Sequence, residues 1–235
     1  MFKNIVTFTN FLLQLPGVNW LMERLLDMWQ FSPEGACPLI RNDRFEELVT
    51  NTNQEVATAL ISYGARAEHI TNGSLVTTLA AIHTIKALDC ETIAFGSFYG
   101  DKKEEEIKKA LLRDLAPGEN VSFVGPVTST TDECVAILHE WQKHGGVEVI
   151  VVVAEGCHAR RARVVWSHFT HYFFPKAKMI FRVVDARDCE DPGNPMPLQR
   201  YWRVWLIVNI ILLPFFKWWP GVNWFAKHNF AQPTK

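Results

Sequence analysis

The chain has 235 residues, which fits one large domain or a core of about 150–200 residues with appendages. Its hydrophobic fraction of 48% and charged fraction of 21% exclude a wholly disordered chain. The mean hydropathy of -0.01 excludes a protein with many membrane spans. The formal net charge of -1 argues against a dedicated nucleic-acid binder, so we expect no nucleic-acid partner.

Charge and tryptophan are distributed unevenly along the chain. No acidic residue occurs before Glu23 or after Asp191, so the part between them carries a net charge of -7 while both ends are basic. Five of the nine tryptophans lie in the last 40 residues. This pattern predicts an N-terminal helical extension over residues 1–54, a core domain over 55–190, and a tryptophan-rich, basic, apolar C-terminal extension over 191–235.

The two ends have features of an interaction surface. The uncharged C-terminal run, residues 204–216, has 13 residues, fewer than the ~20 that a spanning helix needs. Polar residues interrupt the N-terminal apolar segment, so it does not resemble a signal peptide. The sequence Pro-Gly-Val-Asn-Trp occurs at 16–20 and again at 220–224, which suggests that the ends lie side by side. Residues 1–30 and 200–230 are therefore predicted to contact a membrane surface or a second copy of the chain.

The five cysteines are odd in number and widely spaced, with no Cys-x-x-Cys pair. A disulfide framework and a four-ligand zinc site are both disfavoured, and a reducing compartment is the simpler interpretation.

The middle of the chain alternates between strand and helix patterns. Short apolar runs predict strands at 56–63, 92–95, 121–124, 147–154 and 178–184, and helices are predicted at 75–88, 102–115, 130–144 and 158–172. For the helix at 102–115, we place Ile107, Leu111 and Leu115 on the inward face. The alternation predicts an α/β fold with a Rossmann-like, doubly wound, mainly parallel sheet. Ligands of such sheets bind beyond the carboxyl ends of the strands, here the loops 64–66, 96–100, 125–131 and 155–161.

The fourth of these loops is the most distinctive. It places His158, Arg160, Arg161 and Arg163 where a buried strand meets the start of a helix. Cations at this position oppose the helix dipole, so local stability does not explain them. Free backbone N–H groups together with guanidinium groups form a good receptor for phosphate or carboxylate. The loop therefore predicts an anion-binding site.

Four segments, in this order, resemble the ElyC/SanA/YdcF domain family. The segment 151–162 is similar to its strand followed by His-x-x-Arg-Ala, and 128–133 is similar to its Ser-x-x-Thr-x-Glu segment. Residues 95–97 followed by Glu105 resemble its strand, turn and trailing glutamate, and 72–75 resembles the segment after its first strand. The resemblance covers about residues 55–185. The chain departs from the family at Cys134, where the family has Asn, and at Gly96-Ser97, where it has Gly-Gly.

The resemblance implies a Rossmann-like domain, often at the bacterial inner membrane and linked to cell-envelope biogenesis. On chemical grounds, the motif loops are expected to meet at one cleft where cations face carboxylates, which suits a phosphorylated or nucleotide-like anion, with S-adenosylmethionine as one option. The protein is expected to be cytoplasmic or peripheral on the inner membrane. The expected acid–base groups are His158, Glu133 and Glu105. The expected ligand-binding residues are Arg161, Arg160, Gly96, Ser97, Ser129, Thr131 and Asn72.

Two alternative functions remain open. Cys157 to Arg163 has the Cys-x5-Arg spacing of a cysteine phosphatase loop, although no glycine lies between them. The chain also suits a non-enzymatic binding module at a membrane surface or in an oligomer. A metal site at His168 and His171 is disfavoured because three phenylalanines flank them. No Gly-x-Gly-x-x-Gly or phosphate-loop motif supports NAD binding or ATP hydrolysis.

Overall fold

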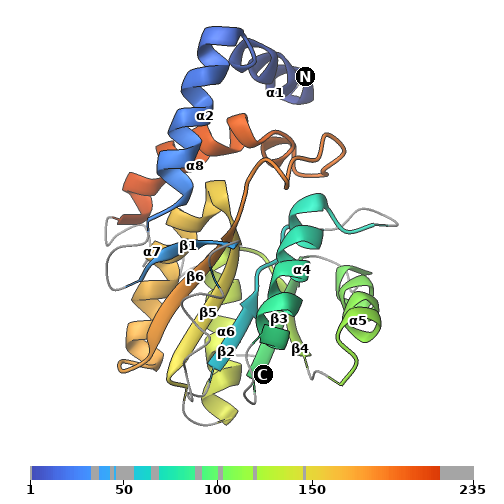
Figure 1. Ribbon diagram of the computed structural model, residues 1–235, viewed down its shortest axis with the longest axis vertical. Helices are drawn as coiled ribbons and strands as arrows, with labels where there is room; N and C mark the ends of the chain where they lie inside the picture. Colours follow the sequence, from blue (N-terminus) through green and yellow to red (C-terminus); the bar gives the residue numbers. More distant parts are fainter. Residues whose placement is uncertain are drawn as a thin grey trace.

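The structure, a computed structural model, describes residues 2–32, 37–42, 45, 56–64, 69–87, 92–99, 103–118, 121–144 and 147–217. In this part of the chain, six parallel strands form a single sheet with helices on both faces, which confirms the predicted fold class (Figure 1). The strands are β1 (Leu39–Arg41), β2 (Val56–Leu60), β3 (Thr92–Tyr99), β4 (Val121–Val127), β5 (Val149–Glu155) and β6 (Lys178–Val184). The helices are α1 (Phe2–Leu13), α2 (Pro16–Gln30), α4 (Asn72–Ala87), α5 (Lys103–Leu115), α6 (Thr130–His144), α7 (Gly156–Phe173) and α8 (Trp202–Lys217), with a 3-10 turn η2 (Pro197–Gln199).

The strand order β1-β6-β5-β2-β3-β4 defines where the chain reverses its direction across the sheet. From β2 the chain passes through α4 and α5 to β3 and β4, and α6 then returns it to β5 on the other side of β2. From β5 the chain continues through α7 in the opposite direction, to β6. The switch point of this doubly wound sheet therefore lies between β2 and β5, where ligands of such folds bind.

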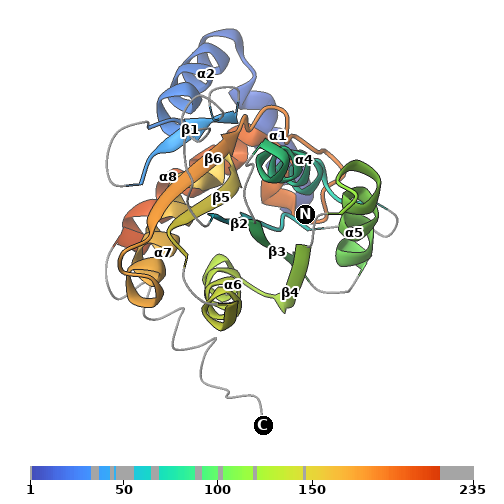
Figure 2. The same cartoon turned by 60° about the horizontal axis from the view of Figure 1, so that its bottom comes forward.

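The core has two apolar layers, one on each face of the sheet (Figure 2). Helices α6 and α7 cover one face and contribute the fully buried Trp141 and Trp166, whose ring centroids lie 6.2 Å apart. Helix α4 covers the central strands on the other face, beside α5. Every residue of β5 is buried, as expected for a β-branched apolar run at the centre of a parallel sheet.

The predicted strands and helices of the middle region are all present, with shifts of a few residues at their ends. One strand was not predicted. The three-residue strand β1 pairs with β6 at the sheet edge, with Leu39 opposite Phe181. It lies in the segment that we assigned to the N-terminal extension, so this segment supplies part of the sheet. Three residues are too few to show the period-2 pattern by which a strand is recognised.

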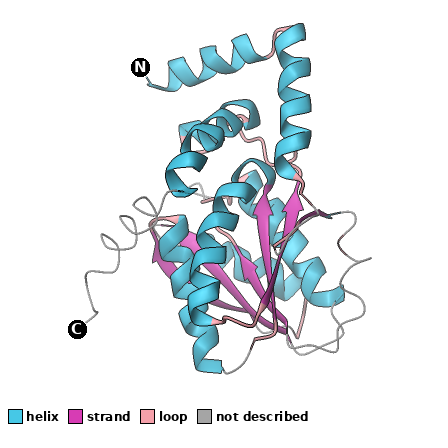
Figure 3. Ribbon diagram, turned by 90° about the vertical axis from the view of Figure 1, so that its left-hand side faces the viewer, coloured by secondary structure: helices cyan, strands magenta, loops and turns pink. Residues whose placement is uncertain are grey.

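Helices α1, α2 and α8 gather at the carboxyl edge of the sheet, where the strand arrows point (Figure 3). Both α2 and α8 pack against α7, and α1 packs against α8. Arg203 of α8 donates a hydrogen bond to Asn19 of α2 at 2.8 Å, so the two extensions do lie side by side. The second Pro-Gly-Val-Asn-Trp segment lies outside the described residues. In the described ranges, no helix combines the length and apolarity needed to cross a bilayer.

Helix α5 turns a different face inward from the one we predicted. Its buried residues are Glu104, Lys108 and Leu112, whereas Leu115 is 41% exposed. The error has a physical cause. The buried stripe begins with an ion pair, in which Lys108 Nζ lies 2.8 Å from Glu104 Oε1, and an apolar-periodicity argument places such a pair in solvent.

Candidate functional site

A chain of hydrogen bonds spans the switch point between β2 and β5. The Glu155 backbone N–H donates to the Tyr63 hydroxyl at 2.8 Å. The Tyr63 hydroxyl lies 3.1 Å from Nδ1 of His158, and Nε2 of His158 lies 3.1 Å from the hydroxyl of Thr130. Loops that follow three different strands, β2, β4 and β5, are thereby joined. The predicted convergence of these loops is present in the structure.

The direction of these bonds follows from the protonation state of His158. Burial, and secondarily the Arg161 charge, lower the pKa of His158 well below its usual range, so the ring is neutral at pH 7. Because the Tyr63 oxygen already accepts from Glu155, its hydrogen is directed to Nδ1 of His158. The single ring hydrogen then sits on Nε2 and is donated to Thr130, which leaves the Thr130 hydroxyl hydrogen available to another group.

Glu133 is fully buried between the ends of β2 and β3. Its Oε1 accepts hydrogen bonds from the Ser62 backbone N–H at 2.8 Å and from the Ser97 hydroxyl, while its Oε2 has no partner among the described residues. Burial raises the pKa of Glu133 to about 7, although the two hydrogen bonds oppose this change. A carboxyl group that titrates near neutral pH suits acid–base chemistry.

A second buried carboxylate lies next to this site. Glu104 accepts hydrogen bonds from the hydroxyls of Ser62 at 2.7 Å and Ser74 at 2.9 Å, and it pairs with Lys108. Lys108 also donates to the Ser97 backbone carbonyl at 3.1 Å. Ser62 and Ser97 each contact Glu133 and also a member of the Glu104–Lys108 pair. The two carboxylates therefore belong to one buried polar network.

A groove of about 300 Å³ opens beside the Thr130 end of this network. One wall consists of four consecutive hydroxyl residues that lead into α6, namely Thr128, Ser129, Thr130 and Thr131. The opposite wall is apolar and comes from Met196 and from Leu212, Phe215 and Phe216 of α8. Arg161 lies between the two walls and is the one formally charged residue among those that line the groove in the described part of the chain.

Arg161 is fixed in place by α8. Its Nε donates to Asn209 Oδ1 at 2.9 Å, and its guanidinium lies over the rings of Trp205 and Phe216 at 5.5 and 5.3 Å. Asn209 is itself held by a bond from its Nδ2 to the Trp205 carbonyl at 2.8 Å. The cation therefore faces the groove from a rigid aromatic support, an arrangement that lowers the entropy cost of binding an anion.

Several predicted site residues lie in or near this site. Arg161, Ser129 and Thr131 line the groove, and Ser97 and Glu133 belong to the buried network. His158, predicted as an acid–base group, is 4% exposed and does not line the groove, and its link to the groove is the contact with Thr130. Gly96 is in β3 beneath the network, where an added Cβ would lie 2.4 Å from the Phe123 ring; this glycine allows close packing.

Three predicted site residues are placed elsewhere. Glu105 pairs with Lys109 at 2.6 Å on the outer side of α5, and the buried acid is its neighbour Glu104. Asn72 donates to the Glu190 carbonyl at 2.7 Å and so fastens the loop after β6. Arg160 donates to the Trp29 carbonyl and, at 2.7 Å, to that of Met28. It caps the carboxyl end of α2, where a cation is favoured by the helix dipole.

The position of Cys157 argues against the cysteine phosphatase alternative. Its side chain is fully buried against Trp202 and Ala186, and the thiol donates to the Trp202 carbonyl at 3.4 Å. Burial raises the pKa of this thiol well above its usual range, with a further contribution from Glu155. A protonated thiol that faces α8 is a poor nucleophile for a phosphate ester.

The sequence analysis missed several residues of the site: Ser62, Tyr63, Ser74, Glu104, Lys108, Trp205 and Asn209. A signal for the buried pair was present, because Glu104, Lys108 and Leu112 share one helical face. A similar signal existed at Asn209, a polar residue within an apolar helix. Nothing local distinguishes Tyr63 and Ser74, whose roles depend on partners from other strands and helices.

Comparisons with protein-family models, with curated proteins and with solved structures gave no significant match to this chain.

Proposed function

We propose that the protein binds a phosphorylated, nucleotide-like anion in the groove between α6 and α8. The observation that supports this most directly is the groove lining, in which Arg161 stands beside four hydroxyl residues and no carboxylate from the described part of the chain. A guanidinium donates up to five hydrogen bonds in a plane and matches phosphate oxygens well. The start of helix α6 lies at the same place, and the positive end of its dipole is partly offset by Asp132, which accepts a hydrogen bond from the Thr128 hydroxyl at 3.1 Å.

The hydrogen-bond chain supports the same assignment. Because neutral His158 donates to Thr130, the Thr130 hydroxyl hydrogen is left to point to a ligand oxygen. The site thus offers donors, both charged and neutral, toward the groove. This is the complement of a phosphate group, whose oxygens only accept when ionised.

The apolar wall indicates the remainder of the ligand. Phe215 and Phe216 of α8 and Met196 of the preceding loop face the hydroxyl wall across the groove. A phosphate that carries a flat or apolar group would occupy both walls, and a nucleotide has this shape. The resemblance of segments 72–75, 95–97, 128–133 and 151–162 to the ElyC/SanA/YdcF family supports a role in cell-envelope biogenesis.

Ligand-dependent thermal stability tests the proposal. The probes are ADP, a nucleotide sugar, S-adenosylmethionine and a short polyprenyl phosphate, each against the wild type. A probe at one hundred times its Kd stabilises the folded state by about 2.7 kcal/mol, which raises the Tm measurably.

The matched variants are Arg161→Gln and Arg113→Gln, the second on the outer side of α5. We expect Arg161→Gln to weaken binding of the active probe by roughly 10- to 100-fold, since it removes a charged hydrogen-bond partner. Arg113→Gln should bind as tightly as the wild type. The proposal fails if no anion stabilises the wild type, or if both variants bind equally well.

A reaction would require an acid–base group, and Glu133 is the group best suited. It lies one turn into α6, beyond Thr130 and Thr131, and its pKa of about 7 allows it to gain and lose a proton at neutral pH. If Glu133→Gln still turns over a bound phosphate ester, Glu133 has a structural role only. No turnover by the wild type would favour the non-enzymatic binding module.

A further inference from the structure

The first two helices expose an unusual number of large apolar side chains. They run from α1 across the junction onto the first turns of α2: Ile5, Phe8, Phe11, Leu12, Leu15, Val18, Trp20 and Leu21, each between 39% and 62% exposed. We call these residues the α1–α2 surface. A folded monomer rarely exposes a continuous apolar patch of this kind unless it is an interaction site.

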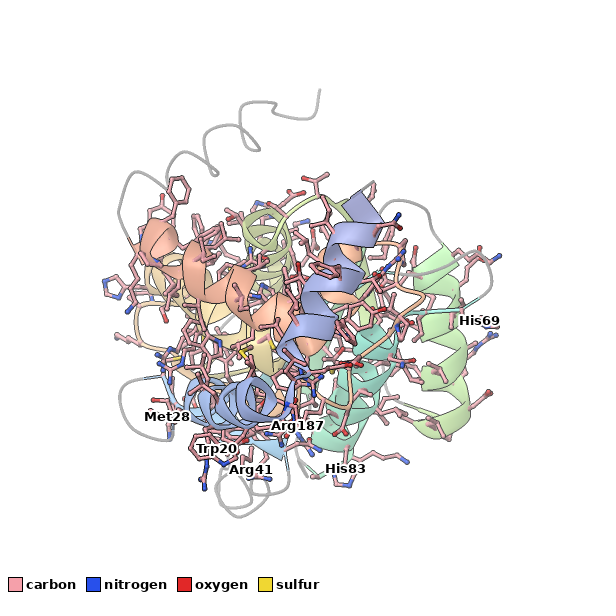
Figure 4. The ribbon with its side chains drawn as sticks, turned by 90° about the horizontal axis from the view of Figure 1, so that it is seen from above. Trp20, Met28, Arg41, His69, His83 and Arg187 are labelled. Atoms are coloured by element: carbon pink, nitrogen blue, oxygen red, sulfur yellow. The ribbon has the colours of Figure 1, made fainter. Side chains whose placement is uncertain are left out.

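The rotation of α1 about its own axis explains this exposure. Its inward face carries Val6 and Asn10, both nearly buried where α1 packs on α8. The opposite face, which a surface helix usually fills with charged residues, carries Ile5, Phe8 and Leu12. Figure 4 looks down on this end of the molecule and shows α1 crossing above α8, with the labelled Trp20 and Met28 at the outer edge of α2.

The apolar surface itself contains no acid, and the nearest acids of α2 are held in ion pairs. The first 22 residues contain a single charged residue, Lys3, and no acid. The acids that follow, Glu23 and Asp27, have side chains that are 34% and 53% exposed, and both pair with Arg187, the first at 2.8 Å. Arg24 is exposed, and its guanidinium lies 5.8 Å from the centre of the Trp20 ring. The α1–α2 surface therefore combines apolar side chains with cations.

We propose that the α1–α2 surface docks on an anionic lipid membrane, with α1 lying in the plane of the interface. Its apolar side chains enter the boundary between headgroups and acyl chains, and Arg24 remains at the level of the lipid phosphates. Trp20, an amphipathic ring beside a cation, is typical of residues at this depth. With 12 residues, α1 is about 18 Å long, which suits a helix that lies on a bilayer and does not cross it.

Charge favours lipid over a second copy of the chain as the occupant. In a twofold dimer the same surface would face itself and bring the two Arg24 side chains together, whereas the nearest acids, Glu23 and Asp27, are already paired with Arg187 within each chain. Anionic phospholipids supply both an apolar interior and the negative charges that these cations need.

Co-sedimentation of the full chain with vesicles tests the proposal. One vesicle preparation is phosphatidylcholine alone, and the other is an equal mixture of phosphatidylcholine and phosphatidylglycerol. We expect the wild type to partition more strongly onto the anionic vesicles. Phe8→Ser with Phe11→Ser should lower this partitioning by at least about tenfold, since two exposed aromatic rings no longer enter the lipid.

Two further variants separate the apolar and the charged contributions. Arg24→Gln should lower partitioning on anionic vesicles by about fivefold and leave partitioning on phosphatidylcholine unchanged. The matched control is Tyr172→Ser, because Tyr172 is 81% exposed at the far end of α7. It should partition like the wild type.

Fluorescence gives a readout that does not depend on loss of binding. Brominated lipids quench indoles that enter the interface, so the quenching of the wild type should exceed that of Trp20→Phe, which keeps an apolar ring at this position. The circular dichroism and Tm of every variant confirm that it is folded.

Three outcomes would overturn the proposal. The first is no sedimentation with either vesicle type. The second is equal sedimentation of the wild type and the Phe8/Phe11 variant, which would place any lipid contact elsewhere in the chain. The third is a stable dimer in solution that the Phe8/Phe11 variant converts to a monomer, which would assign the surface to self-association.

Discussion

The surroundings of Glu133 differ strongly from those of a free glutamate side chain. Burial between two strand ends opposes its ionised form, while Ser62 and Ser97 donate hydrogen bonds to one of its oxygens. The balance raises its pKa from 4.5 to about 7. The folded protein therefore holds this proton more tightly than the unfolded chain does, and folding is linked to pH.

The sign of the linkage gives a test at this site. Between pH 4.5 and 7 the unfolded chain has released the Glu133 proton and the folded protein has not, so this residue's contribution to the free energy of unfolding falls as pH rises. The expected slope is at most about 1.4 kcal/mol per pH unit. Glu133→Gln keeps an oxygen that can accept from Ser62 and Ser97 and removes the titration.

Urea unfolding of both proteins across this pH window measures the difference. The stability of the wild type relative to Glu133→Gln should decline as pH rises toward 7 and level off above it. His158, whose pKa is lowered, contributes an opposite slope to both proteins and cancels in the comparison. A constant difference would show that Glu133 does not titrate in this range.

Local patterns located some residues of the site and misplaced others. Arg161 was predicted in the site because it follows a strand end by a few residues, and Glu133 because segment 128–133 resembles a family motif. Arg160 was predicted as a ligand-binding residue on the same grounds, yet it caps α2 through carbonyls about 130 positions earlier in the chain. A local pattern contains no information about which distant helix end a cation will meet.

At the scale of elements, α5 is the clearest case of tertiary context overriding periodicity. The sequence presents three glutamates in its first turn, and a resemblance to a family motif selected Glu105. The structure instead buries Glu104, because two serine hydroxyls and Lys108 converge on that side of the helix. The helix and its neighbours were predictable, whereas its rotation depended on partners from β3, α4 and the residues that follow β2.

Removing one partner of the buried ion pair of α5 should lower the stability of the protein strongly. Lys108→Met removes the cation and leaves Glu104 buried without its charge partner, which we expect to lower the free energy of unfolding by about 3–5 kcal/mol. Adding Glu104→Gln should recover much of this loss. The neighbouring pair, Lys109 with Glu105, is partly exposed, so Lys109→Met should cost less than about 1 kcal/mol.

Denaturant unfolding of the three variants measures these differences. If Lys108→Met and Lys109→Met cost the same, Lys108 and Glu104 are not a buried pair in solution, and the assigned rotation of α5 is wrong.

At the scale of the whole molecule, one of the contacts that attach the N-terminal helices to the sheet is especially close. Gly156 begins α7 directly after β5, and a Cβ at this position would lie 2.2 Å from Oε1 of Gln30, the last residue of α2. Gln30 is fully buried, and its amide lies 3.2 Å from Asp185 Oδ2 after β6. The contact thus joins α2 to the switch-point end of the sheet.

We expect Gly156→Ala to force Gln30 from this position and to lower the free energy of unfolding by about 1–3 kcal/mol. Gly17 supplies a matched control, because it lies in α2 and a Cβ added there would have no atom within 4 Å. Gly17→Ala should stabilise the protein by about 0.5–1 kcal/mol. The Tm values of both variants test this contrast, and equal shifts would contradict the packing at Gly156.

The packing of α1 on α8 also has a consequence for biosynthesis. Helix α1 comprises residues 2–13, and α8, which covers its inner face, ends only at Lys217. At a synthesis rate of about 5–20 residues per second, the ribosome needs on the order of 10–40 s to make the intervening chain. During this interval the nascent helix contacts only its neighbour α2 among its later partners and lacks the helix that covers its inner face, so that face is open to surfaces outside the chain.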